Sequence, residues 1–299
     1  MRDVCGTRGD DPVERAVACI RERYGDPLSL TDIAESAMLS RFHFARLFKD
    51  TTGITPGRFL AAVRLHQAKR LLLSTSLNVA DIAASVGYSS LGSFTTSFTA
   101  GVGVSPGRFR RLSRTGGGPG VHGPGVHGPG VRGPGLAGVG PAGTGPAGTR
   151  PGARAGCGAV AGTISLPDGH GNARVYVGAF PTPVVQHPAA AGVVVDVPSG
   201  RPSCYRLPGV PAGTWYVHAV AVADGVGPDP RAHRTSLVGG HGSVAVGAGS
   251  VTSTAVRLRR DRPADPPVLL ALPDLEPSRT PLAPAGCPAS TPPSAAASA

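Results

Sequence analysis

One pattern is written twice in this chain, over residues 31–59 and 81–109. A step of fifty positions relates the copies, and it takes Ser40 to Ser90, Phe44 to Phe94, Phe48 to Phe98 and Gly53 to Gly103. Upstream of these positions the step is forty-nine, so the second copy holds one extra residue in its turn. Each copy has the length of a helix-turn-helix unit, and a doubled unit suits a ligand that itself repeats, such as nucleic acid.

The spacing of apolar residues and the placement of capping residues predict seven helices in the first 111 residues. The longest of them runs from Pro56 to about Leu73, with Thr55 as its N-cap and proline at the favoured first position. The other helices are predicted to begin at residue 12, Ser29, Ser40, Asn78, Ser90 and Ser105. The sequence therefore predicts an all-α domain over residues 10–113 that contains two helix-turn-helix units.

The composition changes sharply after this domain. Between residues 114 and 155 a Gly-Pro-Gly-Val unit recurs with a period of five residues. Such a tract buries too little apolar surface to offset the entropy of ordering it. We therefore predict a disordered Gly/Pro-rich linker over residues 114–155. The Pro/Ala/Ser-rich residues 262–299 are likewise predicted to form a disordered tail.

A second domain is predicted between these segments, over residues 156–261. Apolar and polar residues alternate in it, and turns containing glycine or proline separate the runs. Seven strands are predicted, over residues 160–166, 174–180, 193–197, 204–207, 214–222, 243–246 and 252–258. This many short strands favour an all-β sandwich. Residues 207–217 resemble the turn and strand of carboxypeptidase-regulatory-like, transthyretin-type sandwiches, a resemblance that leaves the ligand unknown.

Charge and hydropathy narrow the class of partner. A net charge of +11 and an isoelectric point near 10.3 favour an anionic partner over a neutral one. The longest apolar runs, such as residues 219–223, are far shorter than the roughly 20 residues that a membrane-spanning helix needs. The first residues also lack the apolar stretch of a secretory signal. We therefore expect no membrane association.

The five cysteines Cys5, Cys19, Cys157, Cys204 and Cys287 show no C-x-x-C spacing, which argues against a zinc cluster. An odd number without a secretory signal is most simply five reduced thiols, although a Cys157–Cys204 pair stays open. The histidines match no metal-ligand spacing either. We predict no metal, no cofactor and no catalytic residue.

The second helix of the first copy has a basic outer face. Arg41, Phe42, Arg46 and Lys49 lie outside the apolar stripe that contains Phe44. Arg46 is placed to pair both acceptors of a guanine edge, whereas Phe42 either packs or meets a thymine methyl group. Arg41 and Lys49 are expected over phosphates. The alternative for such a face is an ordinary solvated surface.

The matching face of the second copy carries no formal charge. It consists of Leu91, Gly92, Thr95, Thr96 and Thr99. Threonine can hydrogen-bond a base or a phosphate, but it lacks the bidentate fork of arginine. Glycine near the start of the helix lets the backbone approach closely. We therefore expect the first copy to carry most of the sequence discrimination and the second copy mainly to dock.

The long helix sets the distance between the copies. From Pro56 to Leu73 it spans about 27 Å. With the width of the flanking helices, this approaches the roughly 34–36 Å between successive major-groove faces. One chain is thus expected to fill two adjacent grooves on one side of a duplex. Contacts to phosphates are predicted for Arg64, Lys69, Arg70 and Arg108.

Residues 12–112 resemble the DNA-binding domain of the AraC/XylS family of bacterial transcription regulators, in which a long helix joins two helix-turn-helix units. The matching residues are Ile33-Ala34, Ser40, 44–49, 53–56, Arg64, Ala68, Leu71-Leu72, Ile82-Ala83, 86–88, Phe94, Phe98 and 103–106. The resemblance implies a groove-facing set in each copy. Together with the residues argued above, the predicted DNA contacts are Arg41, Phe42, Ala45, Arg46, Lys49, Ser90, Leu91, Gly92, Ser93, Thr95 and Thr96. Ala45, Thr96 and Thr99 depart from the polar or basic residues common in the family.

Three functional classes fit a double helix-turn-helix domain. We predict a sequence-specific transcription regulator of the bacterial cytoplasm and nucleoid, not an enzyme, with double-stranded DNA and RNA polymerase as partners and an unknown effector of the second domain. DNA-repair alkyltransferases carry a similar domain but need a zinc-held cysteine cluster and a Pro-Cys-His-Arg acceptor, whereas Cys287 stands in Gly-Cys-Pro. The third class is an architectural DNA-binding protein without strong sequence preference, which an affinity comparison at fixed salt would reveal.

Overall fold

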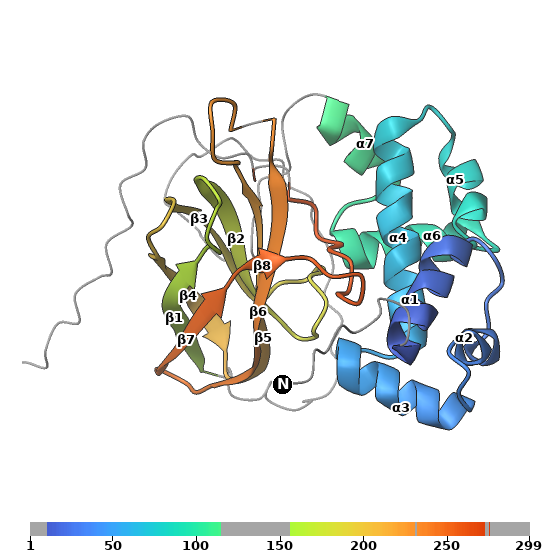
Figure 1. Ribbon diagram of the computed structural model, residues 1–299, viewed down its shortest axis with the longest axis horizontal. Coiled ribbons are helices and arrows are strands. Elements are labelled where there is room, and N and C mark those ends of the chain that lie inside the picture. The colour runs from blue at the N-terminus through green and yellow to red at the C-terminus, as the bar shows by residue number, and fades with distance from the viewer. Residues whose placement is uncertain (1–10, 115–155, 231, 273–274, 276–299) are drawn as a thin grey trace, which may run out of the picture.

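The computed structural model describes residues 11–114, 156–230, 232–272 and 275. The first range is helical and the others are rich in strands, and Figure 1 shows the two parts side by side. The prediction of an all-α part followed by a β-rich part is confirmed. From residue 115 onward the predicted linker lies outside the described residues. None of the described helices combines the length and the hydropathy needed to cross a bilayer.

The described N-terminal range contains seven helices. They are α1 Pro12–Arg23, α2 Leu30–Ser36, α3 Arg41–Thr52, α4 Pro56–Ser74, α5 Val79–Ser85, α6 Leu91–Val102 and α7 Pro106–Arg114. The side chains of Ser29, Thr55, Asn78 and Ser90 each accept a hydrogen bond from a backbone N–H of the first turn, as their N-cap positions predict. Ser40 holds the N-cap position of α3 without such a bond.

The sequence repeat extends to the packing of the core. Phe48 meets Phe59 edge to face with ring centroids 5.4 Å apart, and fifty positions later Phe98 meets Phe109 in the same way at 5.8 Å. All four rings are buried. An aromatic pair of this kind contributes about 1 kcal/mol beyond its buried area. Each helix-turn-helix unit is therefore anchored to the helix that follows it by an equivalent pair.

The turn of each unit requires a residue in the left-handed region. Met38 occupies the first turn with φ 56°, and Gly87, forty-nine positions later, occupies the second with φ 84°. Glycine adopts this conformation freely, whereas another residue is strained by about 1–2 kcal/mol. A Cβ at position 87 would also lie 2.9 Å from Nη2 of Arg64. The second turn is thus relaxed and the first is strained.

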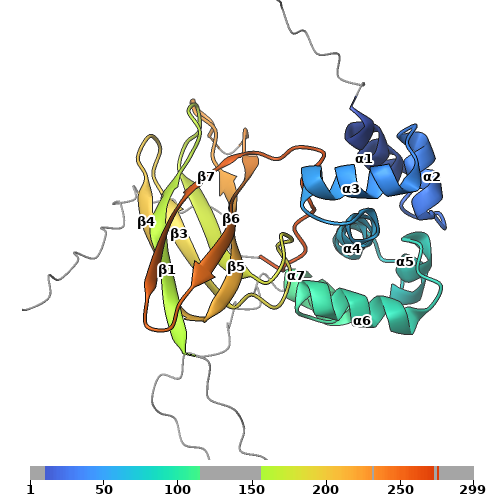
Figure 2. The same ribbon diagram turned by 90° about the horizontal axis from the view of Figure 1, so that it is seen from below.

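The β-rich part has eight strands in its described residues. They are β1 Cys157–Ser165, β2 Ala173–Phe180, β3 Ala191–Val197, β4 Ser203–Pro211, β5 Gly213–Ala223, β6 Thr235–Val246, β7 Val251–Arg257 and β8 Arg259–Arg260. One sheet has the order β4-β1-β7 and the other the order β3-β2-β5-β6-β8. A single buried cluster draws on Val160 and Val256 of the first sheet and on Val177 and Ala219 of the second. The two sheets therefore share a core (Figure 2).

Two strands, β4 and β6, are at least twice as long as the sequence predicted. β6 begins at Thr235 and not at Ser243. The sequence did not predict its first half because Gly239 and Gly240 have low strand propensity and are typical of a loop. These glycines are needed there: a Cβ at Gly239 would lie 2.6 Å from the carbonyl oxygen of Arg257. β4 extends to Pro211, past the predicted end at residue 207.

Loop 181–190 and the segment after β8 cover the outer face of the five-stranded sheet. Leu269 belongs to the core of the helical part, while Leu270 and Leu275 pack with aromatic residues of the sheet. Figure 1 shows this segment passing between the two parts. The prediction of a disordered tail from residue 262 is therefore wrong for residues 262–272. Burial of leucines outweighs the proline content there.

The cysteines also differ from expectation. Cys204 is disulfide-bonded. Cys19 and Cys157 are free thiols. The expectation of five reduced thiols is therefore wrong, and the pairing of Cys157 with Cys204 is not made.

Candidate nucleic-acid interface

The helices α3 and α6 have the same pattern of exposure. Position by position, residues 41–50 and residues 91–100 follow one identical order of exposed, half-buried and buried side chains. Phe44 and Phe48 of α3 turn inward, as do Phe94 and Phe98 of α6, and the first turn of each helix faces outward. Figure 2 shows α3 and α6 on opposite sides of α4. The structure thus presents two equivalent outward faces on one central helix.

The outward face of α3 combines cations with an aromatic ring. Phe42 is 77% exposed, and the guanidinium of Arg41 lies 4.9 Å from the centroid of its ring. The side chain of Arg46 is 87% exposed, and its 3.9 Å contact with Asp50 is a weak surface ion pair that a ligand can replace. Lys49 is exposed and Ala45 is half-buried. This face can donate hydrogen bonds to phosphates or to guanine.

The outward face of α6 is polar but uncharged. Its exposed or half-buried members are Leu91, Gly92, Ser93, Thr95 and Thr96. A Cβ at Gly92 would meet nothing within 4 Å, so the backbone here is open to close approach. The hydroxyl of Ser90 is engaged by the backbone N–H of Ser93 at 3.2 Å. Ser90 therefore acts as a cap, and its neighbours form the face.

Lys69, predicted to contact phosphate, holds the two parts together instead. Its ammonium donates to the carbonyl oxygens of Val268, Leu269 and Leu270 at 3.3, 2.9 and 3.1 Å. Burial lowers the pKa of Lys69 to about 8, so the group is still charged at neutral pH. With its three donors used by carbonyls, Lys69 is not available to a phosphate in this conformation.

Arg64, also predicted to contact phosphate, is half-buried. Its Nε donates to the carbonyl of Tyr24 and its Nη2 to the carbonyl of Asp26, both at 2.7 Å. Its role is to fasten the connection after α1 to α4. Arg70 and Arg108 are exposed, and their contact with phosphates stays a prediction.

The β-rich part meets the helical part away from both outward faces. Pro183 of loop 181–190 lies against the end of α3 at Gly53. The backbone N–H of His187 donates to the carbonyl of Gly101 in α6 at 2.8 Å. Arg21 of α1 donates to the carbonyl of Pro263 at 2.8 Å. Because these contacts use the C-terminal ends of α3 and α6, the first turns of both helices stay exposed.

One exposed residue beside the first face was not in the predicted set. Met38 is 76% exposed and lies in the turn between α2 and α3 of the first unit. The repeat contained the signal, because the step of forty-nine aligns Met38 with a glycine. The first turn has a large apolar side chain where the repeat predicts glycine. Because this side chain is exposed, packing in the core does not explain it.

Comparison with known proteins supports the helical part. Residues 33–112, which include both units, match the family model described as "Helix-turn-helix domain". The uncharacterized HTH-type transcriptional regulator YfiF of Bacillus subtilis is 38% identical over 93 residues, covering 31% of this chain and 29% of that protein. The lactose operon transcription activator of Staphylococcus xylosus is 31% identical over 101 residues, covering 34% of this chain and 36% of that protein.

A third relative combines two activities. The bifunctional transcriptional activator/DNA repair enzyme AdaA of Bacillus subtilis is 35% identical over 95 residues, covering 32% of this chain and 45% of that protein. The chain thus spans between 29% and 45% of the length of these relatives. Among solved structures, the DNA-binding domain of AdpA in complex with a target DNA is 30% identical, covering 35% of this chain and 95% of that chain with a TM-score of 0.34.

The predicted resemblance to AraC-type domains is confirmed for the N-terminal part by these matches. The resemblance of residues 207–217 to transthyretin-type sandwiches stays a prediction.

Proposed function

We propose that this chain is a transcription regulator that binds double-stranded DNA at specific sequences, with α3 and α6 in successive major grooves. The observation that carries the proposal is the identical exposure of these two helices on either side of α4. α4 has 19 residues and a length of about 28 Å, which suits the separation of adjacent groove faces. A single chain then covers one side of the duplex.

The first unit supplies most of the sequence discrimination. Arg46 is exposed and only weakly paired, so its guanidinium is free to pair both acceptors of a guanine edge. The exposed ring of Phe42 meets a thymine methyl group beside it. Arg41 and Lys49 bind phosphates on the two sides of the groove, and Ala45 leaves room for a base edge.

The second unit mainly docks. Thr95 and Thr96 hydrogen-bond bases or phosphates without a bidentate fork, and the bare backbone at Gly92 allows close contact. Leu91 and Ser93 complete this face. Arg70 and Arg108 bind phosphates outside the grooves, because both are exposed cations on the helical part.

The β-rich part is a regulatory module in this proposal. Its two sheets with one shared core support the sandwich class, and its loop at the ends of α3 and α6 supports a role in controlling DNA binding. We propose that this part contacts an effector and that the DNA-bound regulator has RNA polymerase as its partner. Enzymatic repair is not part of the proposal, since the chain lacks the Pro-Cys-His-Arg acceptor of the alkyltransferases.

Selection of bound duplexes from random DNA, followed by affinity measurements at one fixed salt concentration, tests this function. The selected site should bind about a thousandfold or more tighter than random DNA. A ratio near one would support an architectural DNA-binding protein in place of a regulator, because electrostatic binding alone gives no preference.

A further inference from the structure

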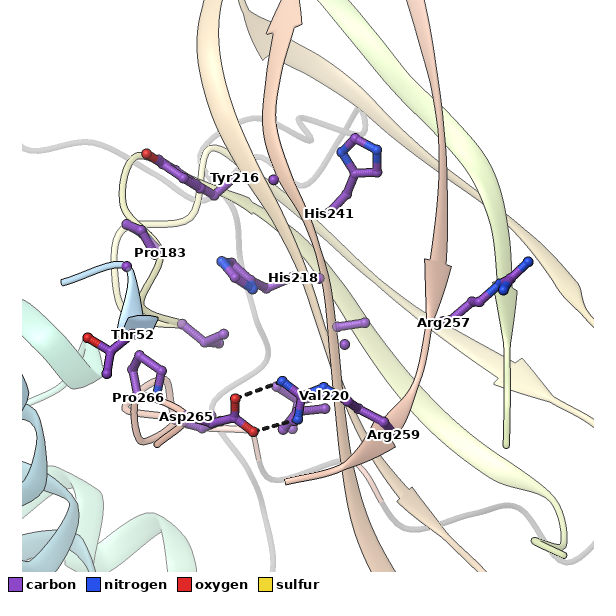
Figure 3. A pocket seen from close by; sticks show the side chains of 18 of the residues that line it. Thr52, Pro183, Tyr216, His218, Val220, His241, Arg257, Arg259, Asp265 and Pro266 are labelled. Atoms are coloured by element: carbon purple, nitrogen blue, oxygen red, sulfur yellow. Dashed lines mark hydrogen bonds and ion pairs between the residues drawn. The ribbon is translucent and has the colours of Figure 1, made fainter. Parts of the chain in front are cut away.

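A groove of about 580 Å³ lies between the end of α3 and the outer face of the five-stranded sheet. Thr52 and Gly53 line it on the helical side, and Tyr216 and His218 of β5 line it on the sheet side. Figure 3 shows the imidazole of His218 directed into the space that Thr52 and Pro183 border from the other side. The volume is in the range of small-molecule sites, which run from about 300 to 1,000 Å³.

The sheet side of the groove is a stacking surface. The rings of Tyr216 and His218 stand on one face of β5 with centroids 6.4 Å apart and planes within 13° of parallel. Phe180, which is fully buried, supports His218 from inside, with ring centroids 6.0 Å apart and planes tilted by 52°. Parallel rings that are exposed along their faces or edges bind a further flat ring favourably. The shape of this wall selects planar, aromatic molecules.

The strand β6 gives the groove a floor with little side-chain bulk. Gly240 pairs with His218, and a Cβ there would lie 2.7 Å from Nδ1 of the imidazole. At Gly242 a Cβ would meet nothing within 4 Å. The register of β5 and β6 shifts between Tyr216 and Val217, a β-bulge of the kind that often re-aims side chains beside binding sites.

His218 also has a ring nitrogen without a hydrogen-bond partner among the described residues. This atom, Nε2, is buried. Burial lowers the pKa of His218 to about 4, so the imidazole is neutral at pH 7. Buried polar atoms are normally paired, and an unpaired ring nitrogen beside a groove is a ready partner for a polar group on a ligand.

The charged groups that line the groove do not favour an anion. The side chain of Arg257, one of the two arginines of the lining, is directed away from the space between His218 and Thr52 (Figure 3). The guanidinium of Arg259 is bound on both sides by the carboxylate of Asp265 at 2.6 and 2.7 Å, which compensates its charge (Figure 3). Asp50 is exposed at the opposite wall. The carbonyl end of α3, which carries the negative end of the helix dipole, also points to this side.

The groove adjoins loop 181–190, which contacts the C-terminal ends of both α3 and α6. Pro183 lines it and lies against Gly53, and four residues later His187 lies against Gly103 at the end of α6. A molecule that fills the groove therefore presses on the contact between loop 181–190 and α3. The same loop carries any displacement to α6.

We propose that this groove binds a small, planar aromatic molecule that is neutral or cationic, and that its binding changes the affinity of the chain for DNA. The second half of this proposal rests on the proposed function, whereas the first half does not. The two halves are tested separately.

Calorimetric titration of the full chain, without DNA, tests the binding. The probes are indole, tryptamine and indole-3-acetate, which share a flat bicyclic ring and differ in charge. Indole and tryptamine are expected to bind, and indole-3-acetate about tenfold or more weakly. Absence of heat with both indole and tryptamine would overturn the proposal, and equal affinity for the acid would overturn the assigned charge.

Two variants locate the site. Tyr216→Leu keeps apolar bulk but removes a ring of the stacking wall, and His218→Ala removes the other ring. Each should weaken tryptamine binding about tenfold or more. The matched control is His233→Ala, which removes an exposed histidine that does not line this groove. Unchanged tryptamine affinity in a Tyr216→Leu protein with an unchanged melting temperature would show that the site is elsewhere.

The regulatory half is tested with the selected duplex. Saturating tryptamine should change its affinity by about fivefold or more, a typical size for coupling between two sites. The change should disappear in Tyr216→Leu. Unchanged DNA affinity with tryptamine bound would overturn the coupling alone, while binding of tryptamine by a chain that prefers no DNA sequence would overturn the proposed function and leave the groove intact.

Discussion

Gly53 and Gly103, fifty residues apart in the chain, end the two recognition helices in the same left-handed conformation and face the same loop of the β-rich part. Their φ angles are 79° and 93°. A Cβ at Gly53 would lie 3.4 Å from Cβ of Pro183, and a Cβ at Gly103 would lie 3.1 Å from Cδ2 of His187. The β-rich part thus touches both helix-turn-helix units at equivalent points. The proposed control of DNA binding through loop 181–190 rests on this arrangement.

Arg46→Ala is expected to weaken binding to the selected site at least about tenfold, since a bidentate arginine–guanine pair contributes about 1–3 kcal/mol of discrimination. Fluorescence anisotropy with the selected duplex measures the loss. Arg23→Ala is the control, because Arg23 is an exposed arginine of α1 whose ion pair is with Asp26. Unchanged affinity and footprint in Arg46→Ala would mean that another face reads the DNA.

Met38→Gly is expected to stabilise the protein by up to about 1 kcal/mol. The substitution relieves the left-handed strain at φ 56°, and the greater entropy of glycine in the unfolded chain offsets part of the gain. Gly87→Met at the equivalent turn should destabilise the protein, because it adds the same strain and a contact with Arg64. Denaturant unfolding monitored by helical circular dichroism checks both. A loss of stability in Met38→Gly contradicts this account of the turn.

Lys69→Met is expected to lower stability by about 1–3 kcal/mol, because three backbone carbonyls lose their donor. It should leave the salt dependence of DNA binding unchanged. Arg70→Ala should do the opposite: the slope of log K against log salt should fall by about one, and stability should be kept. A reduced slope in Lys69→Met would show that Lys69 leaves its carbonyl partners and reaches a phosphate.

Stability is expected to fall as the pH drops from about 6.5 to about 4 because of His218. Its folded pKa is about 4 against 6.5 in the unfolded chain, so the unfolded state binds more protons throughout this window. Because of this group, the free energy of unfolding is about 3 kcal/mol higher above pH 6.5 than below pH 4. His218→Gln should lose less stability over the same window than the native chain. Equal pH dependence of the two proteins, measured by urea unfolding, would rule out a buried neutral imidazole.

Local patterns sufficed to predict the helical part. The caps at Ser29, Thr55 and Asn78 and the inward phenylalanines act within one helix or one turn, so the sequence alone indicates them. Because the pattern is repeated, each prediction for the first unit also applied to the second. The outward faces of α3 and α6 followed from the same periodicity.

Long-range contacts were beyond such patterns. The carbonyls that bind Lys69 lie about two hundred positions away in the chain, and nothing near Lys69 indicates them. The leucines of residues 262–272 looked like part of a proline-rich tail because their burial depends on surfaces from both parts. Gly240 was predicted to lie in a loop. The structure needs glycine there because the imidazole of His218, on another strand, leaves no room for a side chain. Each of these was set by tertiary packing, which overrides local preference.

Dimethyl sulfate protection of the selected duplex tests the central claim most directly. One bound chain should protect guanines in two adjacent major grooves, with centres about 10 base pairs apart and on one side of the duplex. The Arg46→Ala chain should lose protection in one of the two patches and keep the other. Protection confined to a single groove, or the need for two chains to produce both patches, would contradict the account.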